Sequence, residues 1–597
     1  MPSTIQLLAA VEININGLTL KRISSISISQ PFENHHTFEI SISPDMLPEK
    51  STTIDLKKLA EQVVGEVAVI KLKQGQKQED GSIQEKQTRT FKGIATTIRL
   101  NKGSSTSNTI VISGVSNTAV LSAGRTTRSF TDKSLGDIVQ KVLSPFGGLS
   151  KKIAPSYTSP IRYVTQYEED NFHFLQRLAE EYGEWMFYDG EQFVFGKSGR
   201  DKGSEVTLKH GENIFDMQYS LRVTPLNLKG LNYDYYNHLT YEAPSSGENV
   251  SGLGTFAMVG LHKSDAVFSD EPVEIGYQNH REKSTLKKAV RLKKSEQANK
   301  LAVLTGRTPE MELKLGGIVK VVDTYVNDQN KAEVIDYGSF VVTRLSHYLD
   351  TRGVYQCHFE AVPQDTDFAP ADYRILSPNA EPQPAVVMQV DDKDSMGRVK
   401  VQFPWQKNDN EITPWIRVVH PMAARDRGMY FIPEIDEVVF VDFEFGNPDV
   451  PFVTGSMYHG QAKPGDLFEA KNNIKGIITK GGNHIIIDDT DGKEKIKIYN
   501  RESKNEIELS IDGEASIKAK SNGTIYLEAA KGIEMKAPKI TMEADNEVDI
   551  NAGNSVKVEG MTVDVNAQAS GSFKTSAQLE LNGGSMAVLK AAMVMIN

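Results

Sequence analysis

Residues 525–582 read IYLEAAKG, IEMKAPK, ITMEADNE, VDINAGNS, VKVEGMT, VDVNAQAS, GSFKTSAQ and LELN, a unit of eight residues, or sometimes seven, that repeats from about Ile517 to Gly583. In most units the first and third residues are apolar, the second and fourth are polar or charged, and the fifth is small. This alternation predicts a short strand with one face inward and the other in water, followed by a tight turn. The positions that we assign to the inward face are Ile525, Leu527, Ile533, Met535, Ile540, Met542, Val548, Ile550, Val556, Val558, Val563 and Val565.

The short period of the repeat decides how its core can close. A coil wound from one chain needs roughly 18 residues or more to make three faces, whereas one unit of this repeat makes a single face. The other faces must therefore come from other copies of the chain, and the simplest closed arrangement has three chains around a threefold axis. With one strand spacing of about 4.8 Å per unit, the repeat predicts a stiff rod on the order of 40 Å long. An ordinary β-sandwich is the alternative, but its strands seldom keep so constant a period.

Composition narrows the class of protein. At 597 residues, with 39% hydrophobic and 24% charged residues, the chain has the composition of globular protein and the length of about three to five domains. The net charge of −11 and the pI near 5.7 argue against nucleic acid as a main partner. The single cysteine, Cys357, permits no intrachain disulfide. Because the first residues show neither a basic region nor a long apolar run, we expect folding in the cytoplasm and any export to proceed without a cleaved signal.

The first part of the chain reads as strands. One strand after another, with polar turns between them, runs from Ile5 to about Val120 and predicts a β-barrel or sandwich. One short helix is expected at Leu56–Val64. The neighbouring His35 and His36 lack further ligands at metal spacing, so we expect them at the surface or in a turn rather than at a metal.

A helical segment follows the first strands. Ser134–Ser144 begins with an N-cap serine, continues with an apolar stripe and predicts a helix. A second helix is predicted between a capping Asp170 and a terminating Gly183, and after it a hairpin with a turn at Asp189–Gly190. The adjacent Glu180 and Glu181 point different ways on this helix, so we expect both to be solvated rather than paired for acid–base chemistry.

Residues 163–196, YVTQYEEDNFHFLQRLAEEYGEWMFYDGEQFVFG, resemble a segment shared by two kinds of protein. These are VgrG, the valine–glycine repeat spike family of type VI secretion, and the hub proteins of contractile phage tails. The resemblance implies two tube-like β-barrels that form, in a trimer, a pseudo-sixfold ring matching the inner tube. In the second barrel, the basic run Arg281–Lys300 has apolar residues at helical spacing, which indicates a solvated helix face rather than a phosphate or membrane site.

A linker rich in Pro and Asp precedes a second region that carries the resemblance. From Ala385 to Tyr458 the sequence reads as about five strands with sharp turns, the size of a small Greek-key barrel. It resembles the barrel of oligonucleotide/oligosaccharide-binding (OB) type in VgrG and phage spikes. The residues that carry this likeness are Gly397, Arg398, Val399, Phe403, Trp405, Trp415, Arg417, Pro421, Pro433, Glu437, Gly446, Pro448, Asp449, Pro451, Gly455 and Tyr458.

Acidic residues argue against two other interpretations of this region. The clusters at residues 391–394, 436–437 and 442–444 would repel a phosphate backbone, so we expect a collar between tube and needle rather than a nucleic-acid site. The following segment, residues 482–500, resembles the first needle hairpin of the family. Its acidic run at residues 488–491 fails the EF-hand spacing, so we expect a hairpin turn rather than a calcium site.

No catalytic motif is present in the sequence. The phosphate-binding loop, the nucleophile elbow, the H-E-x-x-H zinc motif and paired C-x-x-C motifs are all missing, so we assign no catalytic residue, cofactor or metal. Only 27 residues separate Tyr458 from Ile486, too few for the lysozyme domain of some related phage spikes. We therefore expect no enzymatic activity, against the alternatives of a cell-wall hydrolase with an unrecognised site and of an adhesin-like fibre.

The last residues predict a docking surface. In a trimer, three copies of the terminal run Met593, Val594, Met595, Ile596 and Asn597 form an apolar patch, which a soluble protein seldom leaves bare. These residues resemble the surface on which the family docks a PAAR-repeat tip protein. The alternative is that they only close the trimer core.

The resemblance extends over nearly the whole chain. It implies a mainly β homotrimer that works as the spike and hub of a contractile type VI secretion system, or of a phage tail or phage-tail-like particle. Expected partners are an Hcp-like inner tube, baseplate proteins, a PAAR-repeat protein and effectors, and the target membrane would be contacted mechanically after secretion by injection. The predicted domains are a first barrel (1–125), a helical and hairpin segment (126–200), a second barrel (201–365), a linker (366–384), an OB-type collar (385–460), a neck hairpin (461–506), a triple-stranded β-helix needle (507–583) and a tip (584–597).

Overall fold

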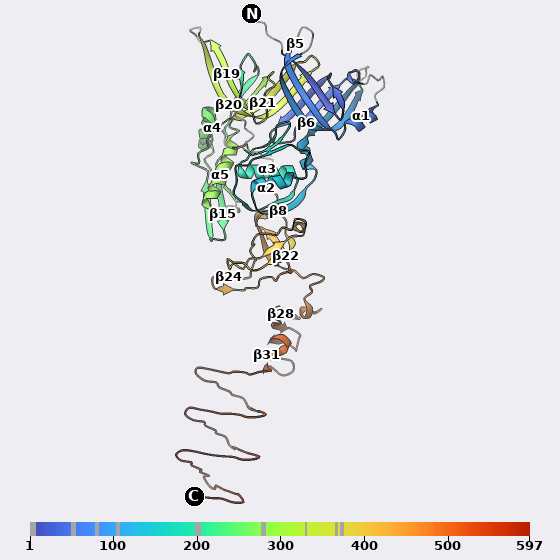
Figure 1. Cartoon of the computed structure of the whole chain (residues 1–597). Helices are drawn as coiled ribbons and strands as arrows, with labels where there is room; N and C mark the ends of the chain where they lie inside the picture. Colours follow the sequence, from blue (N-terminus) through green and yellow to red (C-terminus); the bar gives the residue numbers. More distant parts are fainter. Residues whose placement is uncertain are drawn as a thin grey trace. The chain divides into compact units, whose positions relative to one another are not determined.

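The structure, a computed structural model, describes residues 7–48, 55–77, 83–102, 108–196, 205–275, 282–326, 328, 331–364, 368–370 and 375–596. Strands β1 to β32 far outnumber helices α1 to α5, which confirms the predicted mainly β class (Figure 1). The chain divides into two units, Met1–Pro464 and Gly465–Asn597. Each unit is considered by itself below.

A 13-stranded sheet dominates the first unit. Its strands run in the order β14-β18-β21-β20-β3-β4-β7-β6-β5-β1-β2, and β19 pairs with both β20 and β13. The strands are β1 (Leu7–Ile15), β2 (Leu18–Leu20), β3 (Ser25–Pro31), β4 (Thr37–Ile42), β5 (Val67–Lys77), β6 (Ile83–Lys102), β7 (Asn108–Ser116), β13 (Glu205–Lys209), β14 (Met217–Leu221), β18 (Ala302–Thr308), β19 (Ile318–Val326), β20 (Ala332–Asp350) and β21 (Tyr355–Pro363).

One long strand joins the two regions for which separate barrels are predicted. The first half of β20 pairs with β19, and its second half, from Arg344 to Asp350, pairs antiparallel with β3. Strands from the first 125 residues and from residues 201–365 therefore lie in one continuous sheet. A strand of this length can serve both regions because different parts of it meet different neighbours along the same edge.

Alternating burial shows why these segments form strands. In β3 and β4 every second side chain is buried, among them Ile26, Ile28, Phe38 and Ile40. These side chains join a single hydrophobic core that also contains Trp185 from the segment between the two regions. Period-two alternation is what a sheet with one covered face requires.

The helical segment lies where it is predicted. The short helix α1 (Leu56–Val63) belongs to the preceding strands, and α2 (Leu135–Leu143) begins after Ser134, whose side chain accepts a hydrogen bond from the N–H of Asp137. Helix α3 (Asn171–Tyr182) begins after Asp170 and ends at Gly183, which adopts a φ of 69°. The remaining elements are β8 (Thr126–Lys133), β9 (Lys151–Ile153), β10 (Ile161–Glu169), β11 (Met186–Tyr188) and β12 (Phe193–Phe195), with β11 and β12 forming the expected hairpin.

A smaller layer contains the basic helix. Strands β15 (Lys229–Asp234), β16 (Leu239–Pro244) and β17 (Val273–Glu274) form a sheet, accompanied by α4 (Gly254–Val267) and α5 (Lys283–Ala298). The prediction of a solvated basic face is wrong for Lys294, which is 1% exposed. Its ammonium group lies 3.0 Å from the Asn227 side chain and 3.2 Å from a carboxylate oxygen of Asp265, so hydrogen bonds replace the lost water.

The collar has its own core. Strands β22 (Gln383–Gln389), β23 (Lys400–Gln402), β26 (Val438–Phe443) and β27 (Pro451–Ser456) form one sheet, and β24 (Ala423–Ala424) pairs with β25 (Arg427–Gly428). The buried core residues are Ala380, Ala385, Val387, Val399, Val401, Phe403, Ile416, Val439, Val441, Phe443 and Val453.

The second unit begins with a five-stranded antiparallel sheet. Strands β28 (Ile474–Ile478), β29 (His484–Asp488), β30 (Lys495–Tyr499), β31 (Asn505–Ser510) and β32 (Ser516–Ser521) follow one another in both sequence and space. Beyond β32, residues 522–596 contain no strand or helix, and Figure 1 draws them as an extended winding trace without arrows.

Candidate functional site

The backbone of the eight-residue repeat has almost no partner within its own chain. Between Thr524 and Ile596, all of which the structure describes, a single backbone-to-backbone hydrogen bond joins the N–H of Met586 to the carbonyl of Gly583. Extended backbone normally places its N–H and C=O groups in a ladder, and a strand without one presents free edges on both sides. This stretch therefore offers two unpaired edges to other strands.

The apolar side chains of the repeat are uncovered in the single chain. Among the twelve residues assigned to the inward face, the first-position side chains expose between 51% of their surface, at Ile540, and 57%, at Val556. The third-position side chains of the same set expose between 64%, at Met535, and 77%, at Val565. Isoleucines in the core of the first unit, such as Ile40, expose none. The predicted needle residues thus form one long apolar surface that needs a cover.

The end of the chain is equally open. Met593, Val594, Met595 and Ile596 expose 76%, 52%, 82% and 87% of their surface. Asn597 lies outside the described residues. The apolar patch that the sequence predicts at the tip is therefore accessible in the single chain.

The acidic run before the needle forms a turn. Asp488 ends β29, and its carboxylate accepts hydrogen bonds from the N–H and the hydroxyl of Thr490 at 3.0 and 2.6 Å. The chain then returns as β30, as the hairpin prediction requires. Within the residues that the structure describes, no group of three His, Cys, Asp or Glu side chains is placed to hold a metal ion.

A buried ion pair organises the collar. Arg398 is 2% exposed, and its guanidinium donates to both carboxylate oxygens of Asp392, at 2.9 and 2.7 Å, and to Asp394. These hydrogen bonds hold the pKa of Asp392 well below its usual value. The first acidic cluster of the collar is therefore partly neutralised from inside the protein.

Specific hydrogen bonds attach the collar to the helical segment. The carboxylate of Asp449 accepts the N–H of Thr165 in β10 at 2.6 Å. The amide of Gln406 donates to the hydroxyl of Ser129 in β8 at 2.7 Å. The guanidinium of Arg417 lies 4.4 Å from the ring of Tyr235, at the turn between β15 and β16. Several elements thus hold the collar against the rest of the first unit.

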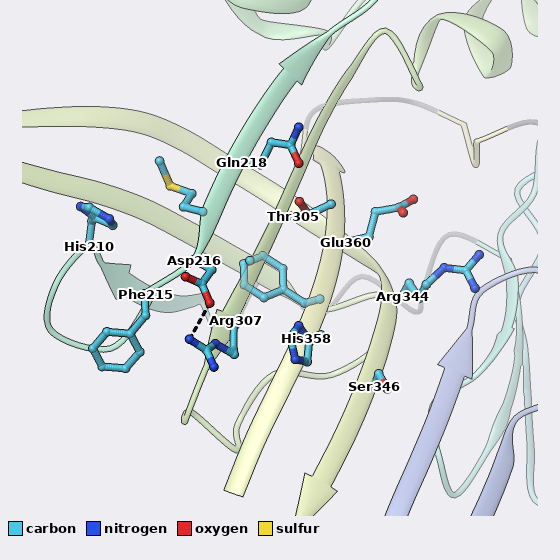
Figure 2. A pocket seen from close by; sticks show the side chains of 13 residues that line it. His210, Phe215, Asp216, Gln218, Thr305, Arg307, Arg344, Ser346, His358 and Glu360 are labelled. Atoms are coloured by element: carbon cyan, nitrogen blue, oxygen red, sulfur yellow. Dashed lines mark ion pairs between the residues drawn. The ribbon is translucent and has the colours of Figure 1, made fainter.

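A hollow of about 630 Å³ lies on the large sheet (Figure 2). Arg307 and Asp216 point toward each other at its side and form an ion pair at 2.5 Å. Arg344 forms a second ion pair, with Glu33. Ser346 and His358 face each other across β20 and β21, but no hydrogen bond joins their side chains among the contacts of the described residues. Both arginines that line the hollow are therefore paired with carboxylates.

A buried polar network, which the sequence analysis missed, lies where β3 and β20 meet. The Gln30 side-chain oxygen lies 2.9 Å from a guanidinium nitrogen of Arg89 and 2.9 Å from Nε2 of His347. The Gln30 amide nitrogen lies 3.1 Å from Nδ1 of His36, and His347 Nδ1 lies 2.6 Å from the hydroxyl of Tyr355. Burial, with the nearby Arg89 charge, lowers the pKa of His36 to about 3 and the pKa of His347 well below its ordinary value.

The expectation that His35 and His36 lie at the surface or in a turn is wrong for His36, which is fully buried. The sequence contained a signal for this burial. His36 is separated by an even number of residues from Phe38, Ile40 and Ile42, so its side chain points to the same inward face as theirs. His35, in contrast, is half-buried, and its two ring nitrogens lie 2.9 Å from the hydroxyls of Thr118 and Ser122.

Two protein families match the chain. The family described as phage tail baseplate hub (GPD) matches residues 32–351, more than half of the chain. The family described as type VI secretion system/phage-baseplate injector OB domain matches residues 383–458, the region for which an OB-type collar is predicted.

Several named proteins are similar to the chain. The type VI secretion system spike protein VgrG1a of Pseudomonas aeruginosa is 24% identical over 537 residues, which cover 76% of this chain and 79% of that protein. The spike protein VgrG2a of the same organism is 36% identical over 149 residues, or 23% of this chain and 18% of that protein. The actin cross-linking toxin VgrG1 of Vibrio cholerae is 34% identical over 114 residues, or 18% of this chain and 10% of that protein.

Solved structures share the fold. A structure of the lidded Francisella PdpA–VgrG complex is similar with a TM-score of 0.54 at 11% identity, covering 87% of this chain and 81% of the other.

In the part of this chain that the structure describes, no helix is long and apolar enough to span a membrane.

Proposed function

The chain belongs to the phage tail baseplate hub family and, within it, to the VgrG spike proteins of type VI secretion, and on this premise we propose that three identical copies assemble into an injection spike without enzymatic activity. One observation carries the proposal: the repeat units from Ile525 to Gly583 leave both their backbone edges and their apolar face uncovered in the single chain. Three wound copies cover both at once, because each strand pairs with strands of the other copies while the apolar faces meet on the axis.

The proposed mechanism is mechanical. Contraction of a sheath drives the spike forward, and the narrow end concentrates the force on a small area of the target envelope. A wound trimer suits this task because all its strands are paired and its core is apolar, so bending must break many interactions together. The protein is made in the cytoplasm, leaves by injection and contacts the target membrane mechanically.

The hub region provides the attachment to the rest of the machine. We place the large sheet against an Hcp-like inner tube, with baseplate proteins around it and the collar as the connection to the needle. Two findings support this assignment. Similar proteins are named type VI secretion spike proteins, and the hub family matches residues 32–351.

The tip is proposed to dock a PAAR-repeat protein, which carries effectors. The exposed apolar run Met593–Ile596 supports this, since a patch of this kind attracts a cover. A recombinant PAAR-repeat protein should bind the full-length trimer, and Met593→Asp together with Met595→Asp should abolish binding while the trimer persists. Lys590→Ala is the matched control and should bind normally. Loss of the trimer in the double variant would show instead that these residues close the core.

The trimer itself is tested by the mass in solution. Light scattering on the purified full-length protein should give three times 66.1 kDa, and a chain that ends at Gln461 should lose this association. A monomeric full-length protein would refute the proposal.

Incubation with peptidoglycan tests the absence of enzymatic activity, since turnover that survives purification would contradict a passive spike.

A phage tail or phage-tail-like particle is the second candidate. Both family descriptions include phage baseplates, so the same hub and spike can serve either machine. The genes that flank this one separate the two, because a secretion system requires membrane-complex genes and a phage particle requires capsid or tail-fibre genes.

A further inference from the structure

Opposite charges face one another across the sheet that precedes the needle. Lys497 on β30 lies directly opposite Glu508 on β31, and Glu508 lies opposite Lys518 on β32. The ammonium groups of Lys497 and Lys518 lie 3.3 and 3.4 Å from the Glu508 carboxylate. The chain thus builds a column in which the sign of the charge changes from each strand to the next.

A second column starts in the same sheet and runs into the repeat. Glu506 lies opposite Lys520, and Lys520 occupies the fourth position of the first repeat unit. The next fourth positions are Glu528, Lys536 and Glu543, so the alternation of sign continues through the sequence. From Glu543 onward no two consecutive fourth positions carry charges of the same sign.

The second positions follow the same rule. Asp549, Lys557 and Asp564 alternate in sign, and the neutral Thr541 and Ser572 lie on either side of this run. Lys557 forms an ion pair with Glu559, the fourth residue of its own unit, which shows that second and fourth positions share one face of the strand. That face is opposite to the apolar one.

In a wound trimer the part of each column that lies beyond β32 joins different chains. Each unit covers one of the three faces, so the strand stacked on a given unit is the following unit of a neighbouring copy, about 4.8 Å away. Consecutive fourth positions, and consecutive second positions, therefore meet between copies. The charges that alternate along the sequence become opposite charges side by side.

The apolar repeat cannot by itself decide how far along the axis the three copies are aligned. Nearly every unit presents the same inward pattern, so a copy displaced by one whole unit would bury almost the same surface. Such a displacement brings Lys520 beside Lys536 and Asp549 beside Asp564, which are charges of the same sign. Like charges on neighbouring strands destabilise the pairing.

We propose that the alternating Lys and Glu or Asp columns on the outer face of the needle are the interaction surface by which one copy of this chain selects the correct axial register of the next. The partner of this surface is a second copy of the same chain. The inference rests on the proposed trimer and adds to it the residues that set its register.

Exchanging the signs of one column tests the proposal. A full-length variant with Asp549→Lys, Lys557→Asp and Asp564→Lys keeps alternating signs and should form its own trimers. When it is co-expressed with the wild-type chain under different tags, native mass spectrometry should find mixed trimers reduced about tenfold or more below the binomial proportion, because mixing places like charges together. The reduction should shrink at high salt, since these charges are exposed.

The matched control removes the charges instead of exchanging them. The variant Asp549→Asn, Lys557→Gln and Asp564→Asn should mix with the wild-type chain in binomial proportion. Any departure from that proportion in this control measures the tendency of chains made together to assemble with one another. Equal mixing of the sign-exchanged and the neutral variants with the wild type would overturn the inference. A wild-type chain that forms no trimers at all would refute the proposed spike itself, which is a different and distinguishable result.

Discussion

Arg398 and Asp392 illustrate how single residues stabilise the collar. The carboxylate of Asp392 is 3% exposed, and the guanidinium of Arg398 is 2% exposed, so each is the main compensation for the other's loss of water. Burying one charge of such a pair without the other is costly, whereas replacing both by apolar groups is often tolerated.

We predict that Arg398→Met destabilises the collar by about 3–5 kcal/mol, because it leaves Asp392 buried without its cation. The double variant Arg398→Met with Asp392→Leu should recover most of the loss. Asp394→Asn is the control and should have a small effect, since Asp394 is 47% exposed. Hydrogen exchange of peptides from β22 and β23 measures these differences, and equal protection in the single variant and the wild type would contradict the prediction.

Two buried histidines should make the hub region sensitive to acid. The pKa of His36 is about 3 in the folded protein and about 6.5 in an unfolded chain. Between these values the unfolded chain takes up the proton and the folded protein does not, so stability falls as the pH decreases below about 6.5. At pH 5 one such histidine lowers the free energy of unfolding by about 2 kcal/mol relative to pH 7.5.

His36→Gln should therefore reduce the pH dependence. Opening free energies from hydrogen exchange in β3 and β4, measured at pH 7.5 and pH 5, should differ less in the variant than in the wild type. His173→Gln is a suitable control, because the His173 side chain is 64% exposed. An unchanged slope in the His36 variant would show that other groups cause the acid sensitivity.

At the scale of elements, sequence signals predicted the helices well and the environment of their side chains less well. The caps at Ser134 and Asp170 and the terminating Gly183 are local features, and the helices begin and end there. The local sequence predicts that Lys294 belongs to a solvated basic face, whereas the side chain is buried. Its burial depends on Asp265 and Asn227, which lie far from it in the sequence.

The period of the needle gives a prediction for this element. Deleting the whole unit Val563–Ser570 should preserve the trimer, because it leaves every following apolar residue in its inward position and brings Glu559 beside Lys574. Deleting only Val563–Asn566 should disrupt it, because the downstream side chains then lie half a unit out of register with the turns. Light scattering distinguishes the two chains, and equal association of both would contradict an eight-residue structural unit.

At the scale of the whole molecule, the continuous sheet of the first unit makes its two strand-rich regions depend on each other. β3 lies between β4 and β20, so removing the second region exposes an edge in the middle of the core. An open apolar edge of this kind promotes aggregation.

We predict that residues 1–200 and residues 201–364 are each poorly soluble when produced separately and recover solubility when produced together. The recovered pair should copurify through the β3–β20 contact. Arg344→Asp, which faces Glu33, should weaken this copurification, and Arg99→Asp, an exposed change within the first fragment, should leave it intact. Two independently soluble fragments would show that each region closes by itself.

Four properties can be read from the sequence alone: the mainly β class, the capped helices, the repeating unit with its inward and outward faces, and the likeness to spike proteins. These properties follow from periodicity and from residues close together in the chain, whose chemistry can be read locally. Three further properties became visible in the folded protein: β20 joins the two regions in one sheet, His36 and Lys294 are buried, and Arg398 partly neutralises an acidic cluster. Those outcomes depend on which residues, distant in the sequence, meet in space. Burial and pairing set the charge state and the environment of a side chain. A local sequence pattern does not specify the distant partner of that side chain.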